Sequence, residues 1–155
     1  MKAYEYQVHT CVEDSDGVAH AVIKNPHLGH FATLFLEADK VTRLIELFEG
    51  EFQEESTYLW QFIADSWKFQ GFVPISIVLD HDETKDHMVP CITFLQDQGE
   101  RGKIHVTIFS PIGAALEIAS RMNVPLFVTE LAQGYMNKKD ISGLNAYIKE
   151  VEGKR

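Results

Sequence analysis

The 155-residue sequence has no apolar run that approaches the roughly 18 residues needed to span a bilayer. Its first ten residues, MKAYEYQVHT, also lack the apolar core of a secretory signal peptide. Only two cysteines are present, Cys11 and Cys91, and neither belongs to a Cys-x-x-Cys pair typical of zinc or redox sites. We therefore expect a cytoplasmic protein with no membrane span. Both cysteines are interpreted as reduced, buried small apolar residues, with a disulfide between them as the alternative.

Positive charge is also scarce. Lys and Arg together number 14 against 23 Asp and Glu, which gives a formal net charge of −9. Because nucleic-acid affinity comes largely from neutralising phosphates, this balance disfavours DNA or RNA as a tightly bound partner. It still allows an enzyme that engages nucleic acid briefly, above all if a bound metal ion reverses the local charge.

What the sequence does contain is an ordinary globular composition, with 45% apolar and 24% charged residues. The length fits one domain over residues 1–155. The order of elements predicts an α+β fold, with a mixed or largely antiparallel sheet, packed helices and two strand–helix units. Strands are predicted over residues 1–12, 18–23, 31–36, 73–79, 88–95 and 104–109, and helices over 39–48, 56–69, 111–122 and 140–151.

The most informative stretch is residues 104–132, IHVTIFSPIGAALEIASRMNVPLFVTELA. Its first six residues are β-branched or aromatic and predict a strand. Ser110 is a candidate N-cap, and the fixed φ of Pro111 suits a first helical turn. Small and apolar residues then recur at helical spacing. Asn123 tolerates a left-handed conformation, and the following Val124-Pro125 forces an extended exit into a second strand.

This stretch resembles the end of the bifunctional nuclease domain, a family associated with cleavage of both DNA and RNA. The family pattern there is a strand, Arg-Pro-Ser-Asp-Ala, a small-residue helix, Gly-x-Pro-Ile-x-Val and an acidic turn. The order of elements agrees from about residue 18 to 132, including a strand, acidic hairpin and strand over residues 72–95. The positions that match family motifs are Glu49, Gly50, Thr57, Ala115, Ala119, Arg121, Pro125, Phe127, Val128 and Glu130.

The resemblance implies a nuclease that hydrolyses DNA or RNA phosphodiesters with a metal-activated water. The family's polar residues, however, are mostly replaced. Its Arg and Asp fall within residues 110–114, where this chain has SPIGA, and its His-Asp pair falls at Tyr58 and Leu59. Neither of these side chains can act as a base or metal ligand at neutral pH. The alternative is a catalytically inactive family member that acts as an oligomeric binding or regulatory module.

Potential metal ligands are densest over residues 80–87, DHDETKDH. Carboxylates and imidazoles are the side chains that Mg²⁺ and Mn²⁺ sites use. We predict Mg²⁺ or Mn²⁺ binding by Asp80, Asp82, Asp86 and His87, with Asp80 facing His87 across a hairpin. These four residues are suggested by composition and not by a family motif. The alternative is an ordinary polar hairpin tip.

Aromatic residues gather in the helix predicted over residues 56–69. They could stack nucleic-acid bases, but their helical spacing favours the core or a subunit interface. We therefore expect a homo-oligomer with closed symmetry.

Overall fold

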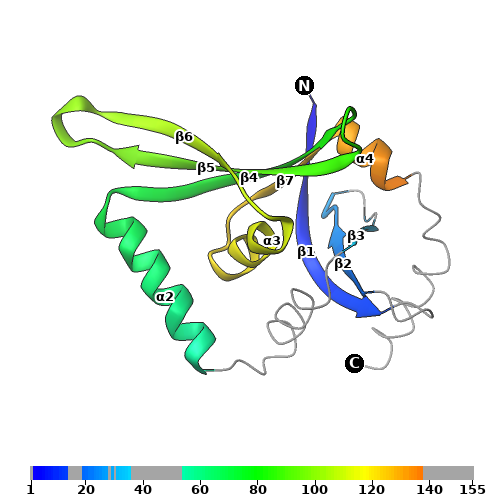
Figure 1. The fold of residues 1–155 in the computed structure, drawn as a ribbon, viewed down its shortest axis with the longest axis horizontal. Helices are drawn as coiled ribbons and strands as arrows, with labels where there is room; N and C mark the ends of the chain where they lie inside the picture. Colours follow the sequence, from blue (N-terminus) through cyan, green and yellow to red (C-terminus); the bar gives the residue numbers. More distant parts are fainter. Residues whose placement is uncertain (1, 14–18, 28, 30, 36–53, 138–155) are drawn as a thin grey trace.

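Seven strands and three α-helices form the part of the chain that the computed structural model describes, residues 2–13, 19–27, 29, 31–35 and 54–137 (Figure 1). A short 3-10 helix, η1, lies between two of the strands. In chain order the elements are β1 (Ala3–Glu13), β2 (Ala19–Lys24), β3 (Phe31–Phe35), α2 (Glu54–Phe69), β4 (Phe72–Asp82), β5 (His87–Asp97), η1 (Gly99–Arg101), β6 (Lys103–Phe109), α3 (Ile112–Arg121), β7 (Leu126–Thr129) and α4 (Glu130–Asn137).

All seven strands belong to one sheet, in the order β3-β2-β1-β7-β4-β5-β6. Neighbouring strands are antiparallel except β4 and β7, which are parallel. The first residues of β1 pair with β7, and the rest of β1 pairs with β2, so β1 joins the two halves of the sheet. The predicted single-domain α+β fold with a mixed sheet is therefore confirmed.

The hydrophobic core lies on one face of this sheet. Ile77 and Leu79 of β4 are fully buried, and Ile92 of β5, directly across from Ile77, is almost so. Each such aliphatic side chain contributes about 1.5–3 kcal/mol through burial. Helix α3 covers this face because its apolar residues recur at helical spacing, and helix α4 contributes Ala132 and Met136 to the same cluster.

The connection from β6 through α3 to β7 follows the sequence prediction closely, with one correction. The helix begins at Ile112, and its N-cap is Pro111, whose ψ of 144° is extended. The Ser110 hydroxyl donates to the Pro111 carbonyl oxygen at 2.9 Å, so the expected serine cap is wrong. Asn123 has φ +52°, which confirms the predicted left-handed stop.

Helix α2 divides its aromatic residues between two environments. Trp67 packs edge-on against Phe94 of β5, with 5.1 Å between ring centroids, and Trp60 also packs against the core. Tyr58 and Phe62 are 64% and 69% exposed on the other side of the helix. The expected core role therefore holds for the two tryptophans, which pack against the core. The remaining aromatic residues of α2 lie on the surface.

Several predicted features lie outside the described residues, namely Gly50, the helix over 39–48 and the C-terminal helix over 140–151. The sequence does not predict helix α4, because Glu130 matches the acidic turn of the family pattern, whereas in the structure it begins a helix. Of the two predicted strand–helix units, the second is present as β6 and α3.

Candidate functional site

The acidic hairpin joins β4 and β5, and its tip is shorter than the sequence suggested. Strand β4 continues to Asp82 and β5 begins at His87, so only four residues form the turn. Asp82 pairs with His87, whereas Asp80 pairs with Val89. The expectation that Asp80 faces His87 is therefore wrong. The two strands continue to pair beyond Asp80 for two further residue pairs. The partner of Asp80 therefore lies two residues further along β5 than His87.

Asp80 is held by the strand next to it. Its carboxylate accepts a hydrogen bond of 2.7 Å from the Thr129 hydroxyl and one of 2.8 Å from the His81 backbone N–H. Thr129 is itself buried, and its hydroxyl oxygen accepts from the Ala132 N–H in the first turn of α4. Asp80 thus ties β4 to the junction between β7 and α4.

Asp82 closes the turn. Its Oδ1 accepts from the Thr84 hydroxyl at 2.6 Å, from the Thr84 N–H at 2.9 Å and from the Lys85 N–H at 3.3 Å. The hydrogen bond from the Thr84 hydroxyl is the main reason that the pKa of Asp82 lies below its ordinary value. These contacts account for an aspartate at this position without a metal ion.

Asp86 and His81 connect the hairpin tip to α4. Asp86 has φ +52°, and its Oδ1 lies 3.2 Å from Nε2 of His81. The His81 ring stacks on Tyr135 of α4, with centroids 4.2 Å apart and the planes inclined by 21°. The His81 side chain is only 9% exposed. We did not single out His81 from the sequence, although its even spacing from the buried Ile77 and Leu79 places it on the core face.

These contacts leave the predicted metal ligands dispersed. Among residues 2–13, 19–27, 29, 31–35 and 54–137, no group of three or more His, Cys, Asp or Glu side chains could hold a metal ion. Three of the four predicted ligands nevertheless line the same cavity: Asp82, Asp86 and His87.

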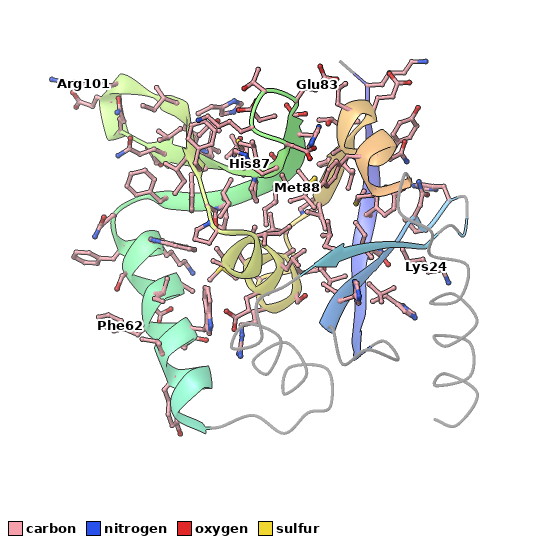
Figure 2. The ribbon with its side chains drawn as sticks, turned by 45° about the vertical axis from the view of Figure 1, so that its right-hand side comes forward. Lys24, Phe62, Glu83, His87, Met88 and Arg101 are labelled. Carbon is pink, nitrogen blue, oxygen red and sulfur yellow. The ribbon has the colours of Figure 1, made fainter. Side chains whose placement is uncertain are left out.

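This cavity, which we call the hairpin pocket, lies between the β4–β5 hairpin, the start of α3 and helix α4. It has a volume of about 710 Å³. Figure 2 shows His87 and Met88 on the hairpin wall of this region, with Glu83 at the tip. The pocket could not be predicted from the sequence, because its walls come from segments that are distant along the chain. Its lining comprises Leu34, Asp82, Lys85, Asp86, His87, Met88, Val89, Pro90, Phe109, Ser110, Pro111, Ile112, Tyr135 and Met136.

Most of the hairpin pocket is apolar. Leucine, valine, isoleucine, phenylalanine, proline and two methionines form its walls, and methionine adapts readily to ligands of different shape. Polar groups lie mainly on the hairpin, where Lys85 and His87 are exposed. Ligand sites of this kind combine an apolar body with a few polar groups that fix orientation, in volumes of about 300–1,000 Å³.

Several positions that match the nuclease family take part in packing or backbone contacts of the fold. Ala115 is fully buried in α3, and the Arg121 Nε lies 3.7 Å from Oε1 of Glu117 one turn earlier. The Pro125 carbonyl oxygen accepts from the Ile77 N–H at 2.9 Å, and the Glu130 N–H donates to the Lys2 carbonyl oxygen. Thr57 lies in α2, away from this segment in the chain.

No family model matches the sequence, and a comparison with curated proteins found no similar sequence. None of the described helices is long and apolar enough to cross a membrane.

Proposed function

We propose that this domain is a non-catalytic binding module that takes a predominantly apolar ligand in the hairpin pocket. The observation that carries this proposal is the pocket itself, whose walls are mainly apolar while its carboxylates are engaged in the turn. A metal-dependent hydrolase would need several ligands that converge on one metal ion, and no such group exists among the described residues. A binding module needs only apolar walls and a few orienting polar groups.

We interpret the resemblance to the bifunctional nuclease family as common ancestry and not as retained activity. The order of elements from residue 18 to 132 supports it, and the replaced polar motif residues support an inactive member. A fold shared with an enzyme does not preserve its chemistry once the reacting groups are gone.

Ligand binding can be tested by chemical-shift mapping with two ten-carbon probes, 1-decanol and decanoate, on ¹⁵N-labelled protein. We expect shifts at the amides of Met88, Ile112 and Met136. Ile112→Trp should fill the pocket and abolish these shifts. Leu131→Trp, a matched substitution on the exposed side of α4 outside the pocket, should leave them unchanged. Shifts confined to other surfaces, or none with either probe, would contradict the proposal.

A metal-dependent nuclease is the second candidate, because Asp82, Asp86 and His87 line one pocket. The test is cleavage of labelled single-stranded DNA and RNA with Mg²⁺, Mn²⁺ or EDTA. The Asp82→Asn/Asp86→Asn variant keeps the side-chain oxygens that build the turn, and Asp97→Asn is its control in the other hairpin turn. We expect no metal-dependent cleavage. Cleavage that is lost only in the double variant would establish the nuclease instead.

We also propose that the module works in the cytoplasm as a homo-oligomer with closed symmetry. Large apolar side chains on the surface support self-association. Sedimentation equilibrium tests it, and a protein that is monomeric at all concentrations would refute it. The exposed apolar residues are Tyr58, Leu59, Phe62, Phe69, Val73, Ile104, Ile108, Phe109 and Leu131.

A further inference from the structure

Strand β6 is an edge strand whose side chains are exposed on both faces. It is the last strand of the sheet order and, within the described residues, pairs only with β5. Of its seven residues only Val106 is half-buried, while Ile104, Ile108 and Phe109 are 41%, 46% and 79% exposed. The β5–β6 hairpin projects beyond the body of the molecule (Figure 1). An apolar edge of this length is a template for another strand.

The sequence of β6, KIHVTIF, is complementary to itself in the antiparallel direction. A two-fold axis through Val106 would place Val106 opposite its own copy, and Ile104 opposite Ile108 of the second copy. All three side chains lie on the same face by strand alternation. Directly opposite pairs of β-branched residues stabilise antiparallel strands.

The distribution of charge also favours antiparallel pairing of two β6 strands. The strand holds no carboxylate, although the chain as a whole carries a net charge of −9, so this is a surface where two copies can approach. In the antiparallel register, Lys103 lies opposite Phe109 of the second copy, a pairing that allows cation–π contact. The two lysines would then lie about 20 Å apart, given a rise of about 3.4 Å per residue. Parallel pairing in register would instead bring like charges together.

We propose that β6 is the self-association edge of this protein, and that two copies pair their β6 strands antiparallel about Val106 into one continuous sheet. This inference rests on the homo-oligomer proposed above and names its surface. Its test does not depend on a ligand in the hairpin pocket. Phe109 lines that pocket, so the pairing would add Lys103 of the second copy to its rim.

The register can be tested by charge pairs at two exposed positions. In the Ile104→Glu/Ile108→Glu variant, two glutamates would face two others, and we expect the dimer Kd to rise by at least about tenfold. In Ile104→Lys/Ile108→Glu, each lysine would face a glutamate of the second copy, and the Kd should return to within about threefold of the unmodified protein. Sedimentation equilibrium measures both values.

A matched control separates this edge from helix α2. Leu59→Glu/Phe62→Glu adds the same charge to two exposed positions of that helix and should leave the dimer Kd unchanged. Dissociation by the α2 variant alone would overturn the β6 edge while keeping the homo-oligomer. An unmodified protein that is monomeric, or that forms open-ended assemblies, would overturn both. Failure of the lysine–glutamate variant to restore the dimer would overturn the register.

A second measurement covers the case in which a charged variant fails to fold. Opposite Cα atoms in antiparallel strands lie about 4.5–5.5 Å apart, within the range that a disulfide spans. Val106→Cys, in a background with Cys11→Ser and Cys91→Ser, should form a covalent dimer under mild oxidation. Thr107→Cys in the same background would face His105 of the second copy and should cross-link at least about tenfold more slowly, since diagonal positions lie beyond disulfide reach. Equal rates would contradict the proposed register.

Discussion

The two hairpins that share β5 have turns of the same local chemistry but opposite surroundings. At the β4–β5 tip, Asp82 accepts from the backbone N–H two residues on, and at the β5–β6 tip Asp97 accepts from the Gly99 N–H, each at 2.9 Å. The first tip is held against α4 through the stack of His81 on Tyr135. The second reaches into solvent with Arg101 at its end (Figure 2). Local turn chemistry closes either hairpin, and tertiary contacts decide which one becomes a pocket wall.

The largest expected difference in stability is between a buried isoleucine of β4 and an exposed isoleucine of β6. Ile77→Ala should lower the free energy of unfolding by about 2–5 kcal/mol, because it leaves a cavity in the core. Ile108→Ala should cost less than about 1 kcal/mol in the monomer, because the side chain is almost half exposed. Urea unfolding, with the protein at a concentration below the dimer Kd, measures both free energies of unfolding. Equal losses would show that the β5–β6 hairpin is packed as tightly as the core.

The next effect is at Gly71, where the end of α2 meets the β5–β6 hairpin. This residue has φ +80°, and an added Cβ would lie 2.8 Å from the Asp97 carbonyl oxygen, which belongs to the backbone and cannot easily move. Gly71→Ala should therefore cost about 1–3 kcal/mol of unfolding free energy. Gly134→Ala, in α4 with open space around it, should instead stabilise by about 0.5–1 kcal/mol. Thermal unfolding should show a lowered midpoint for Gly71→Ala and a raised midpoint for Gly134→Ala.

A smaller effect separates the histidines of the two hairpins. His81→Ala removes the stack on Tyr135 and the contact with Asp86, and should cost about 1–2 kcal/mol. The change should also speed amide exchange in α4, which hydrogen-exchange mass spectrometry would detect. His105→Ala, on the exposed strand β6, should change the stability of the monomer by less than about 0.5 kcal/mol. Unchanged exchange in α4 would contradict the proposed link between the tip and this helix.

The smallest effect is electrostatic. Thr84→Val removes the hydroxyl that donates to Asp82, so the pKa of Asp82 should rise towards its ordinary value. A lowered pKa in the folded state contributes stability above the unfolded pKa, and this contribution is lost as the pH falls through the folded value. The variant should therefore lose less stability between neutral pH and pH 2. NMR titration of the Asp82 carboxyl measures the shift, and Thr107→Val should not move it.

Much of the fold could be predicted from the sequence because the relevant signals are local. Asn123 followed by Val124-Pro125 predicts the stop after α3 and the extended entry into β7, and both are present. The strands predicted over residues 73–79 and 88–95 are likewise present as β4 and β5, which extend further at both ends. These patterns depend only on neighbouring residues along the chain.

The candidate site was less predictable because it depends on contacts between distant segments. The aspartates of the acidic hairpin resemble a ligand set in sequence, but Thr129 engages Asp80 and the turn engages Asp82. Leu34 and Met136 line the same pocket although they are far apart in the chain, and no local sequence signal predicts this. Had the strand predicted over residues 73–79 been extended by two residues, side-chain alternation would have placed His81 on the core face.

The central position of β7 has a consequence for biosynthesis. Ala3 pairs with Thr129, so the first four residues of β1 find their partner strand only after β7 has been synthesised. At about 5–20 residues per second, β1 waits roughly 6–25 s before its first four residues can join the sheet. Until then Tyr4 and Tyr6 lack the β7 neighbours that they have in the folded domain. Completion of the sheet at β7 is therefore expected to be a late event in folding.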